Sequence, residues 1–398
     1  MRISGTAGEK ILTNRQEANK ILTGIIIFSI YALYSVLIFS IAALNIFFGA
    51  AFILWIIKIA VNPDRKFQKT DLDIAFLLYF LTRLISIPLS INISSSLPKI
   101  WSELLFFSIY FIITTNFREE IKTKSIYILR ILSFTSAAAS VIGIYMFLSK
   151  TAERAQSTTS GYYTLGIYLT ACLAIIMMQP GNKKLFSNKL YYYLYIFITA
   201  AGIICTLDRM HWIITGILFI VISIINKDYK PVLIFAGIAA VLILAIPDVG
   251  ARLMKLIYLK SNMSDRDIVF QGFLNIADKK PVFGFGLNTF SEIFPLKEKL
   301  VDKGVGSWHN DYIQIYVESG LVGLLAVLYM IFRIYKTAIK SLKRISSENK
   351  NLIIGLMLSL ATMFIAGGFI DTLCSFLFRL EIAIIAVICT APKLKENS

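Results

Sequence analysis

The segment from Asp265 to Gly323 decides how the rest of this chain is understood. It begins DRDIVFQGFLNIADKK (265–280), continues with the glycine-punctuated PVFGFG (281–286) and reaches SWHNDYIQIYVESGLVG (307–323). It is the only long water-compatible stretch between hydrophobic runs, and it holds His309, one of only two histidines in the protein. We therefore expect a solvent-facing loop that leads into an apolar helix, and this loop is the first place to look for chemistry.

The whole chain has the composition of a polytopic membrane protein. Its 398 residues are 57% apolar and only 16% charged, with a mean hydropathy of +0.72, and this apolar share is far above that of a soluble domain. A transmembrane helix needs about 20 mostly apolar residues to cross roughly 30 Å of hydrocarbon. We therefore predict an all-α membrane protein with about twelve spans, at 21–40, 41–61, 73–90, 98–115, 125–148, 162–178, 189–206, 211–226, 231–247, 311–334, 351–369 and 372–390.

The order of these spans predicts three regions. Residues 1–247 hold spans one to nine, residues 248–310 form a large, partly helical loop, and residues 311–398 hold spans ten to twelve and a tail. Lys and Arg in the short connections fall mostly on the side of the N-terminus, which predicts cytoplasmic termini and an outward, periplasmic loop. The net charge of +16 is then a signal of topology and of contact with lipid headgroups, and we expect no nucleic-acid partner.

The long loop has a pattern of its own. Apolar residues at helical spacing from Asp267 onward predict a short amphipathic helix on the membrane surface, which ends at Pro281. The turn that contains Gly284 and Gly286 allows the backbone to approach another group closely. A helix that packs over the bundle without a catalytic role is the alternative.

Three arginines lie on the side that the charge rule leaves poor in them. Arg154 precedes span six, Arg209 lies between spans seven and eight, and Arg266 lies in the long loop. Charged groups near membrane depth are kept in cavities with partners, and guanidinium groups bind phosphate oxygens through two parallel hydrogen bonds. We therefore expect an anionic guest, and three guanidinium groups suit a pyrophosphate.

A histidine beside several cations favours its neutral form, which accepts a proton near neutral pH. His309 lies where the loop re-enters the membrane and is our candidate general base, with a plain helix-start position as the alternative. His211 has the same chemistry, but its place beside Trp212 indicates an interfacial residue.

No nucleophile triad, zinc spacing or Walker loop is present, so we expect no metal and no cofactor. Two Asp-x-Asp tripeptides occur, at Asp71–Asp73 and Asp265–Asp267. The first is suited to a helix start, and the second has an arginine between its acids, which disfavours a dication.

Of the further charges within predicted spans, we interpret four as structural pairs or snorkelling side chains. Arg83 and Arg130 are expected to pair with carboxylates or to snorkel. Arg379 and Glu381 are two residues apart, so they point to different faces of their helix and each needs a partner on a neighbouring helix.

Several of these segments resemble the shared core of bacterial O-antigen ligases and O-antigen polymerases. The resemblance rests on KPVFGFG (280–286), WHN (308–310) and ESGLVGL (318–324). TLDRMHW (206–212) is similar to the family's Thr-x-Ser-Arg-Gly-x-Trp, and ERAQS (153–157) is similar to its arginine-led segment before the middle span. Twelve spans with a large loop between the ninth and tenth also fit the family.

This resemblance implies an inverting, metal-independent glycosyltransferase of the bacterial inner membrane. The donor is a glycan on undecaprenyl pyrophosphate, and the acceptor is a sugar of lipid A–core or another lipid-linked repeat. Arg154, Arg209 and Arg266 would bind the pyrophosphate, and His309 would activate the acceptor hydroxyl. Asp208 and Met210 replace the family's serine and glycine, so Asp208 is available to pair with Arg209.

The sequence leaves three alternative functions to consider. A polymerase shares the core, although the moderate loop without an added soluble domain favours a ligase. A transporter or a flippase for lipid-linked sugars also has many helices and buried arginines, but the two halves of this chain show no repeat. A scaffold without catalytic activity has no use for arginines at three separate outward sites.

Overall fold

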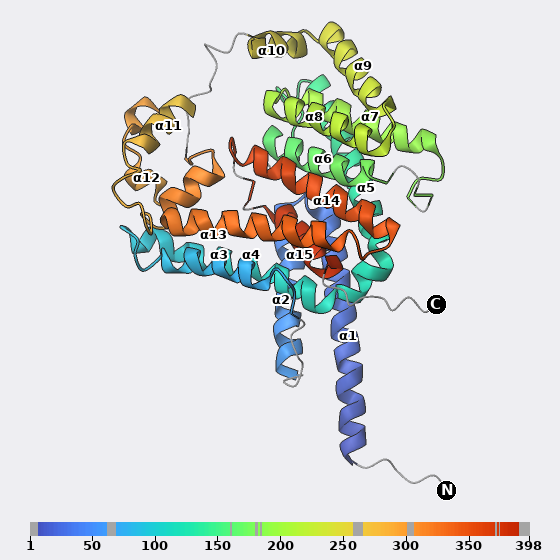
Figure 1. Cartoon of the computed structure of the whole chain (residues 1–398), viewed down its shortest axis with the longest axis vertical. Coiled ribbons are helices and arrows are strands. Elements are labelled where there is room, and N and C mark those ends of the chain that lie inside the picture. Colours follow the sequence, from blue (N-terminus) through green and yellow to red (C-terminus); the bar gives the residue numbers. More distant parts are fainter. Residues whose placement is uncertain are drawn as a thin grey trace.

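The computed structural model describes residues 7–61, 69–159, 161–179, 182–183, 185–257, 266–300, 306–370, 372–373 and 375–389. Every regular element in this part of the chain is a helix (Figure 1). The elements are α1 (Ala7–Val36), α2 (Ile41–Val61), α3 (Asp73–Ile85), α4 (Ile93–Asn116), α5 (Arg118–Leu148), α6 (Tyr162–Met177), α7 (Lys189–Cys205), α8 (Arg209–Asn226), α9 (Lys230–Ala245), α10 (Pro247–Ile257), α11 (Arg266–Leu274), α12 (Phe290–Ile293), the 3-10 turn η2 (Lys297–Lys299), α13 (Asp311–Ser341), α14 (Ser347–Ala366) and α15 (Phe376–Cys389).

Each of the twelve predicted spans is mostly helical, so the all-α prediction is confirmed for the described residues. By length and apolar composition, seven of the described helices are able to cross a membrane, or up to eight if the bent pair α9–α10 is one span. The helices α3, α6, α7, α9 and α15 are shorter, with 13, 16, 17, 16 and 14 residues. The protein is therefore a multi-pass membrane protein. Twelve crossings, the three-region division and the outward loop stay predictions.

Two short helices lie at the centre of the fold. From Leu165 onward nearly every residue of α6 is buried, because α5, α7, α8 and α14 surround it. Most of α15 is buried in the same way between α4, α5, α13 and α14. A helix that is apolar on all sides suits such a position. In Figure 1, α13 runs beside α3, while α1 and α2 extend away from the bundle.

The long loop contains more helix than the sequence predicted. The helix α10 was not predicted, and it is bent by 107° from α9. The helix α11 ends at Leu274 and gives way to turns, so the predicted helix up to Pro281 was too long. Val269 and Ile276 are buried in a small apolar cluster with Trp308 and Val317, which joins this part of the loop to α13.

The helix α13 is broken at Gly320, where φ is +67° and ψ is −168°. The break leaves two N–H groups and two carbonyls without the partners of a continuous helix, and the 281–286 loop satisfies all four. The replacement hydrogen bonds are Leu321 N–H to Pro281 C=O (2.8 Å), Val322 N–H to Val282 C=O (3.3 Å), Phe285 N–H to Val317 C=O (2.7 Å) and Gly286 N–H to Glu318 C=O (3.1 Å).

This insertion explains the glycines in the two motifs. Gly284 has a φ of +72°, and a Cβ there would lie 2.5 Å from the carbonyl oxygen of Val317. A Cβ on Gly320 would overlap the backbone of Val282. The close backbone approach predicted for the Gly284–Gly286 turn is therefore confirmed, and its partner is the break in α13.

Substitution Gly320→Ala is expected to destabilise the protein. A residue other than glycine in this conformation costs roughly 1–3 kcal/mol, and the contact with Val282 adds to that figure. We expect a clear drop in the Tm of the purified protein in detergent. Gly237→Ala in α9 is the matched control, because a Cβ there meets nothing within 4 Å. Equal melting of both variants would contradict the tight contact.

A buried charge network lies beside the break. The Nη2 atom of Arg83 on α3 is 3.1 Å from Glu103 of α4 and 2.7 Å from Glu318 of α13. The predicted pairing of Arg83 with carboxylates is thus confirmed. Glu381 accepts a hydrogen bond from Ser359 Oγ on α14 at 2.7 Å, and the Arg379 guanidinium lies 5.6 Å from the Phe107 ring on α4. Glu381 and Arg379 thus each contact a group on a neighbouring helix, as predicted.

Candidate anion-binding site

The amino-terminal ends of α6 and α8 and the carboxyl-terminal end of α14 meet in one place. Ile214 of α8 is buried against Ala366 and Ile370 at the end of α14, with Tyr163 of α6 and Met210 packed around them. These ends lie far apart in the sequence. The apolar cluster therefore brings the start of α6, which follows Arg154, next to the start of α8, which carries Arg209.

Two neighbouring tyrosines at the start of α6 hold two of these arginines. The guanidinium of Arg154 lies 4.2 Å from the ring centre of Tyr162, and Arg266 donates from Nη2 to the hydroxyl of Tyr163 at 3.3 Å. The two rings are 4.2 Å apart. The Nη1 atom of Arg154 is buried and has no hydrogen-bond partner among the described residues. The structure thus brings Arg154 and Arg266 to the same turn of α6.

Arg209 is the first residue of α8, and Asp208 before it caps that helix by accepting a hydrogen bond from the N–H of Met210. The other carboxylate oxygen of Asp208 lies 2.6 Å from Nδ1 of His211. Burial raises the pKa of the Asp208 carboxyl, but its interactions with His211, the backbone N–H of Met210 and Arg266 together leave that pKa below its usual range. In the described part of the chain, the Asp208 carboxylate is hydrogen-bonded to His211 and to the backbone N–H of Met210.

The interfacial interpretation of His211 was wrong, because its side chain is fully buried. Gly166 of α6 provides the space, since a Cβ there would lie 2.8 Å from Nδ1 of His211. His211 therefore anchors the start of α8 beneath α6 and is closed to an incoming acceptor.

A fourth arginine, which the sequence analysis did not single out, joins the group. Arg252 of α10 donates from Nε to the carbonyl of Leu207 at 3.0 Å. It lies within electrostatic range of both Arg154 and Arg209. It was missed because positive charges of the long loop carry little weight in the charge rule, and because α10 was not predicted.

A cavity of about 500 Å³ lies between the segment before α6, the α7–α8 turn and α10. Arg154, Arg252 and Glu153 line it, as do Lys150 and Asp248, which form an exposed ion pair of 3.2 Å. Among the described residues, no ion pair involves Arg154, Arg252 or Arg266. Although Glu153 and Asp248 also line the cavity, guanidinium groups that make no ion pair with a carboxylate favour an anion in the space between them.

His309 lies at the start of α13 with a φ of +47°, and its Nδ1 is 3.3 Å from the hydroxyl of Ser307. The next residue, Asn310, caps α13 and donates from Nδ2 to the carbonyl of Gly368 at 2.7 Å. The guanidinium of Arg266 lies 6.0 Å from the ring centre of Phe369. The backbone at His309 and the side chain of Arg266 therefore flank the same turn after α14.

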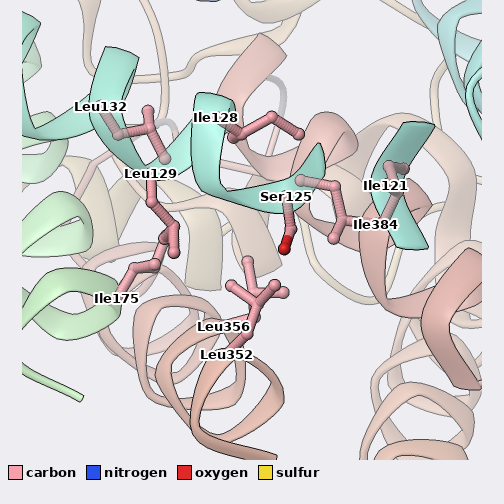
Figure 2. Close-up of a pocket in the computed structure, with 9 residues that line it drawn as sticks. All are labelled: Ile121, Ser125, Ile128, Leu129, Leu132, Ile175, Leu352, Leu356 and Ile384. Carbon is pink, nitrogen blue, oxygen red and sulfur yellow. The ribbon is translucent and has the colours of Figure 1, made fainter. Parts of the chain in front are cut away.

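A second pocket differs from the arginine-lined cavity in the residues that line it. It lies between α5, α6, α14 and α15 and is lined by eight aliphatic side chains and one polar residue, Ser125 (Figure 2). It holds no charged group, so it cannot compete with the arginine-lined cavity for an anionic ligand.

The Asp-x-Asp tripeptides receive no support as metal sites in the described part of the chain. Groups of three or more His, Cys, Asp or Glu that fit a metal are absent there. The Asp73 carboxylate accepts hydrogen bonds from Thr70 and Tyr110, and Asp265 lies outside the described residues.

Part of this site lies in a segment that matches a known protein family. Residues 194–328 match the family model described as O-antigen ligase. This segment forms an O-antigen ligase domain. It contains Arg209, Arg252, Arg266 and His309, and also the 281–286 loop with the break in α13, whereas Arg154 precedes it. The resemblance predicted from the sequence is thus confirmed.

A curated protein of Rickettsia conorii, named "Putative polysaccharide ligase", is 26% identical to this chain over 200 residues. The match covers 46% of this chain and 45% of that protein, so the chain spans about half the length of this relative.

Proposed function

We propose that this protein is an inverting glycosyltransferase of the bacterial inner membrane, with cytoplasmic termini and a periplasmic active site. It moves a glycan from undecaprenyl pyrophosphate to the hydroxyl of an acceptor sugar. The observation that carries this proposal is the grouping of Arg154, Arg209 and Arg266 around the starts of α6 and α8. Within the described residues, Arg154 and Arg266 have no carboxylate partner.

The arginines supply what the leaving group requires. As the glycan departs, negative charge develops on the diphosphate, and fixed guanidinium groups stabilise that charge. Because they present paired N–H donors, they also orient the phosphate oxygens. A diphosphate needs little help from an acid to leave, so positioning and charge are the main demands on the protein.

His309 is the proposed general base. The acceptor hydroxyl oxygen forms a bond to the anomeric carbon while the bond from that carbon to the diphosphate oxygen breaks. The electron pair of the broken bond stays on the diphosphate, and the hydroxyl proton passes to His309. Attack from the face opposite the leaving group inverts the anomeric configuration.

The proposed mechanism predicts transfer without a metal ion, because the arginines take the place of a dication on the diphosphate. Purified protein treated with excess EDTA is expected to keep its full rate of glycan transfer. The measurement compares initial rates with and without chelator. Loss of activity that added Mg²⁺ or Mn²⁺ restores would contradict this part of the mechanism.

For the acceptor we propose lipid A–core, which makes the protein an O-antigen ligase; a second lipid-linked repeat would make it a polymerase. The test is reconstitution with a lipid-linked glycan and either rough lipopolysaccharide or more lipid-linked repeat. Ligation yields lipopolysaccharide that is heavier by one glycan, and polymerisation yields a ladder on the carrier lipid. A flippase would move the donor across the bilayer and form neither product.

A further inference from the structure

We propose that Arg252 is a fourth phosphate ligand, and that the donor site has two halves, one for each phosphate. In the first half Arg252 acts with Arg154 and Arg209 and holds the phosphate attached to the lipid. In the second half Arg266 and Tyr163 hold the phosphate attached to the sugar. This inference rests on the proposed function.

The first half is the arginine-lined cavity. Arg154 from the segment before α6 and Arg252 from α10 both line it, together with the carboxylates Glu153 and Asp248. Arg209 adds its charge from the first turn of α8. Of these three groups, Arg154 has a buried Nη1 with no hydrogen-bond partner in the described part of the chain. A phosphate in this space supplies the acceptor oxygens that such donors require.

Arg252 is held in place before any ligand arrives. Its Nε donates to the carbonyl of Leu207, a residue whose φ of +53° turns the chain sharply between α7 and α8. This hydrogen bond uses one of the five N–H donors of the guanidinium and leaves four for other acceptors. A side chain fixed in this way loses less conformational entropy on binding.

The second half lies nearer to the proposed base. Arg266 reaches the hydroxyl of Tyr163 and the ring of Phe369, and the turn at Phe369 is bonded to the residue after His309. The sugar must lie beside the base, so the phosphate bonded to the sugar belongs here. Tyr162 and Tyr163 lie within electrostatic range of Arg252 and so connect the two halves.

Binding of undecaprenyl monophosphate tests the first half of the site without the second, because this lipid carries only the lipid-side phosphate. Its binding to the purified full-length protein is measured for the wild type, Arg252→Gln, Arg252→Lys and Arg266→Gln. A charge-assisted contact is lost in Arg252→Gln, so its affinity should fall about tenfold or more, and that of Arg252→Lys by less. The affinity of Arg266→Gln for the monophosphate should stay within about twofold of the wild-type affinity if each phosphate has its own half.

The matched control is Lys279→Gln, which removes one positive charge from an exposed position of the same loop and should leave the affinity unchanged. Gln retains an N–H donor for the Leu207 carbonyl, and a melting curve verifies that each variant is folded. Should Arg252→Gln unfold, Arg252→Lys still tests the proposal, because a lysine that binds like wild type refutes the need for a guanidinium. The salt dependence of binding should also weaken in Arg252→Gln.

The possible failures can be told apart. If Arg252→Gln binds the monophosphate as well as Lys279→Gln does, Arg252 is not a phosphate ligand, although the proposed function stands. If the Arg252 and Arg266 variants lose affinity equally, the division into two halves is wrong. If the wild type binds neither the monophosphate nor the diphosphate lipid, the proposed function itself fails.

Discussion

Replacement of His309 by alanine is expected to abolish glycan transfer while donor binding stays close to that of the wild type. General base catalysis typically contributes about 10²–10⁴-fold to a rate, and within the O-antigen ligase domain His309 is the histidine not buried beneath α6. The measurement is the initial rate of product formation in proteoliposomes, together with a separate binding curve for the lipid-linked donor.

The backbone at His309 calls for a second variant. Its φ of +47° lies in the left-handed region, which asparagine tolerates better than alanine. His309→Asn therefore preserves the local conformation but removes the base, and it should lose as much activity as His309→Ala. A fully active His309→Asn protein would remove the base assignment, whereas activity lost only in the alanine variant would point to backbone strain.

Substitution Arg266→Gln is expected to reduce the catalytic rate by about 10²–10³-fold, the usual effect of removing one donor to a developing charge. Arg266→Lys keeps the positive charge but loses the paired N–H donors and the stacking of a planar group. We therefore expect an intermediate rate for the lysine variant. Both variants should change kcat more than KM, because the contact strengthens as the diphosphate leaves.

The control for this pair is Arg333→Lys, near the other end of α13, where the side chain donates to the carbonyl of Asp71. It makes the same chemical change away from the site and should retain wild-type kinetics. An Arg266→Lys protein with the wild-type rate would contradict bidentate phosphate binding at this position.

The helices were predictable from the sequence because their signal is local. Runs of apolar residues gave twelve spans, and each is mostly helical, since a hydrophobic segment of that length has few other folds in a membrane. Amphipathic α10 has no such run, so the same reasoning did not find it. Helix formation alone does not give the number of membrane crossings, because that number also depends on how the helices lie in a bilayer.

The site was predictable in its chemistry but less so in its geometry. Arg154 and Arg266 do meet at one turn of α6, and sidedness alone suggested that they belong together. The pairing of Asp208 with His211 was not foreseen, because it depends on the space that Gly166 leaves on another helix. In the same way, the hydrogen bonds between the 281–286 loop and the break at Gly320 join distant segments, and no local pattern encodes them.

The central claim is that a lipid diphosphate binds among these arginines. Its most direct test is a cryo-electron microscopy structure of the purified protein with undecaprenyl pyrophosphate. We expect density for the lipid-side phosphate between Arg154 and Arg252, and for the other phosphate beside Arg266. Density for the diphosphate at the other end of the bundle, away from all three arginines, would contradict the account.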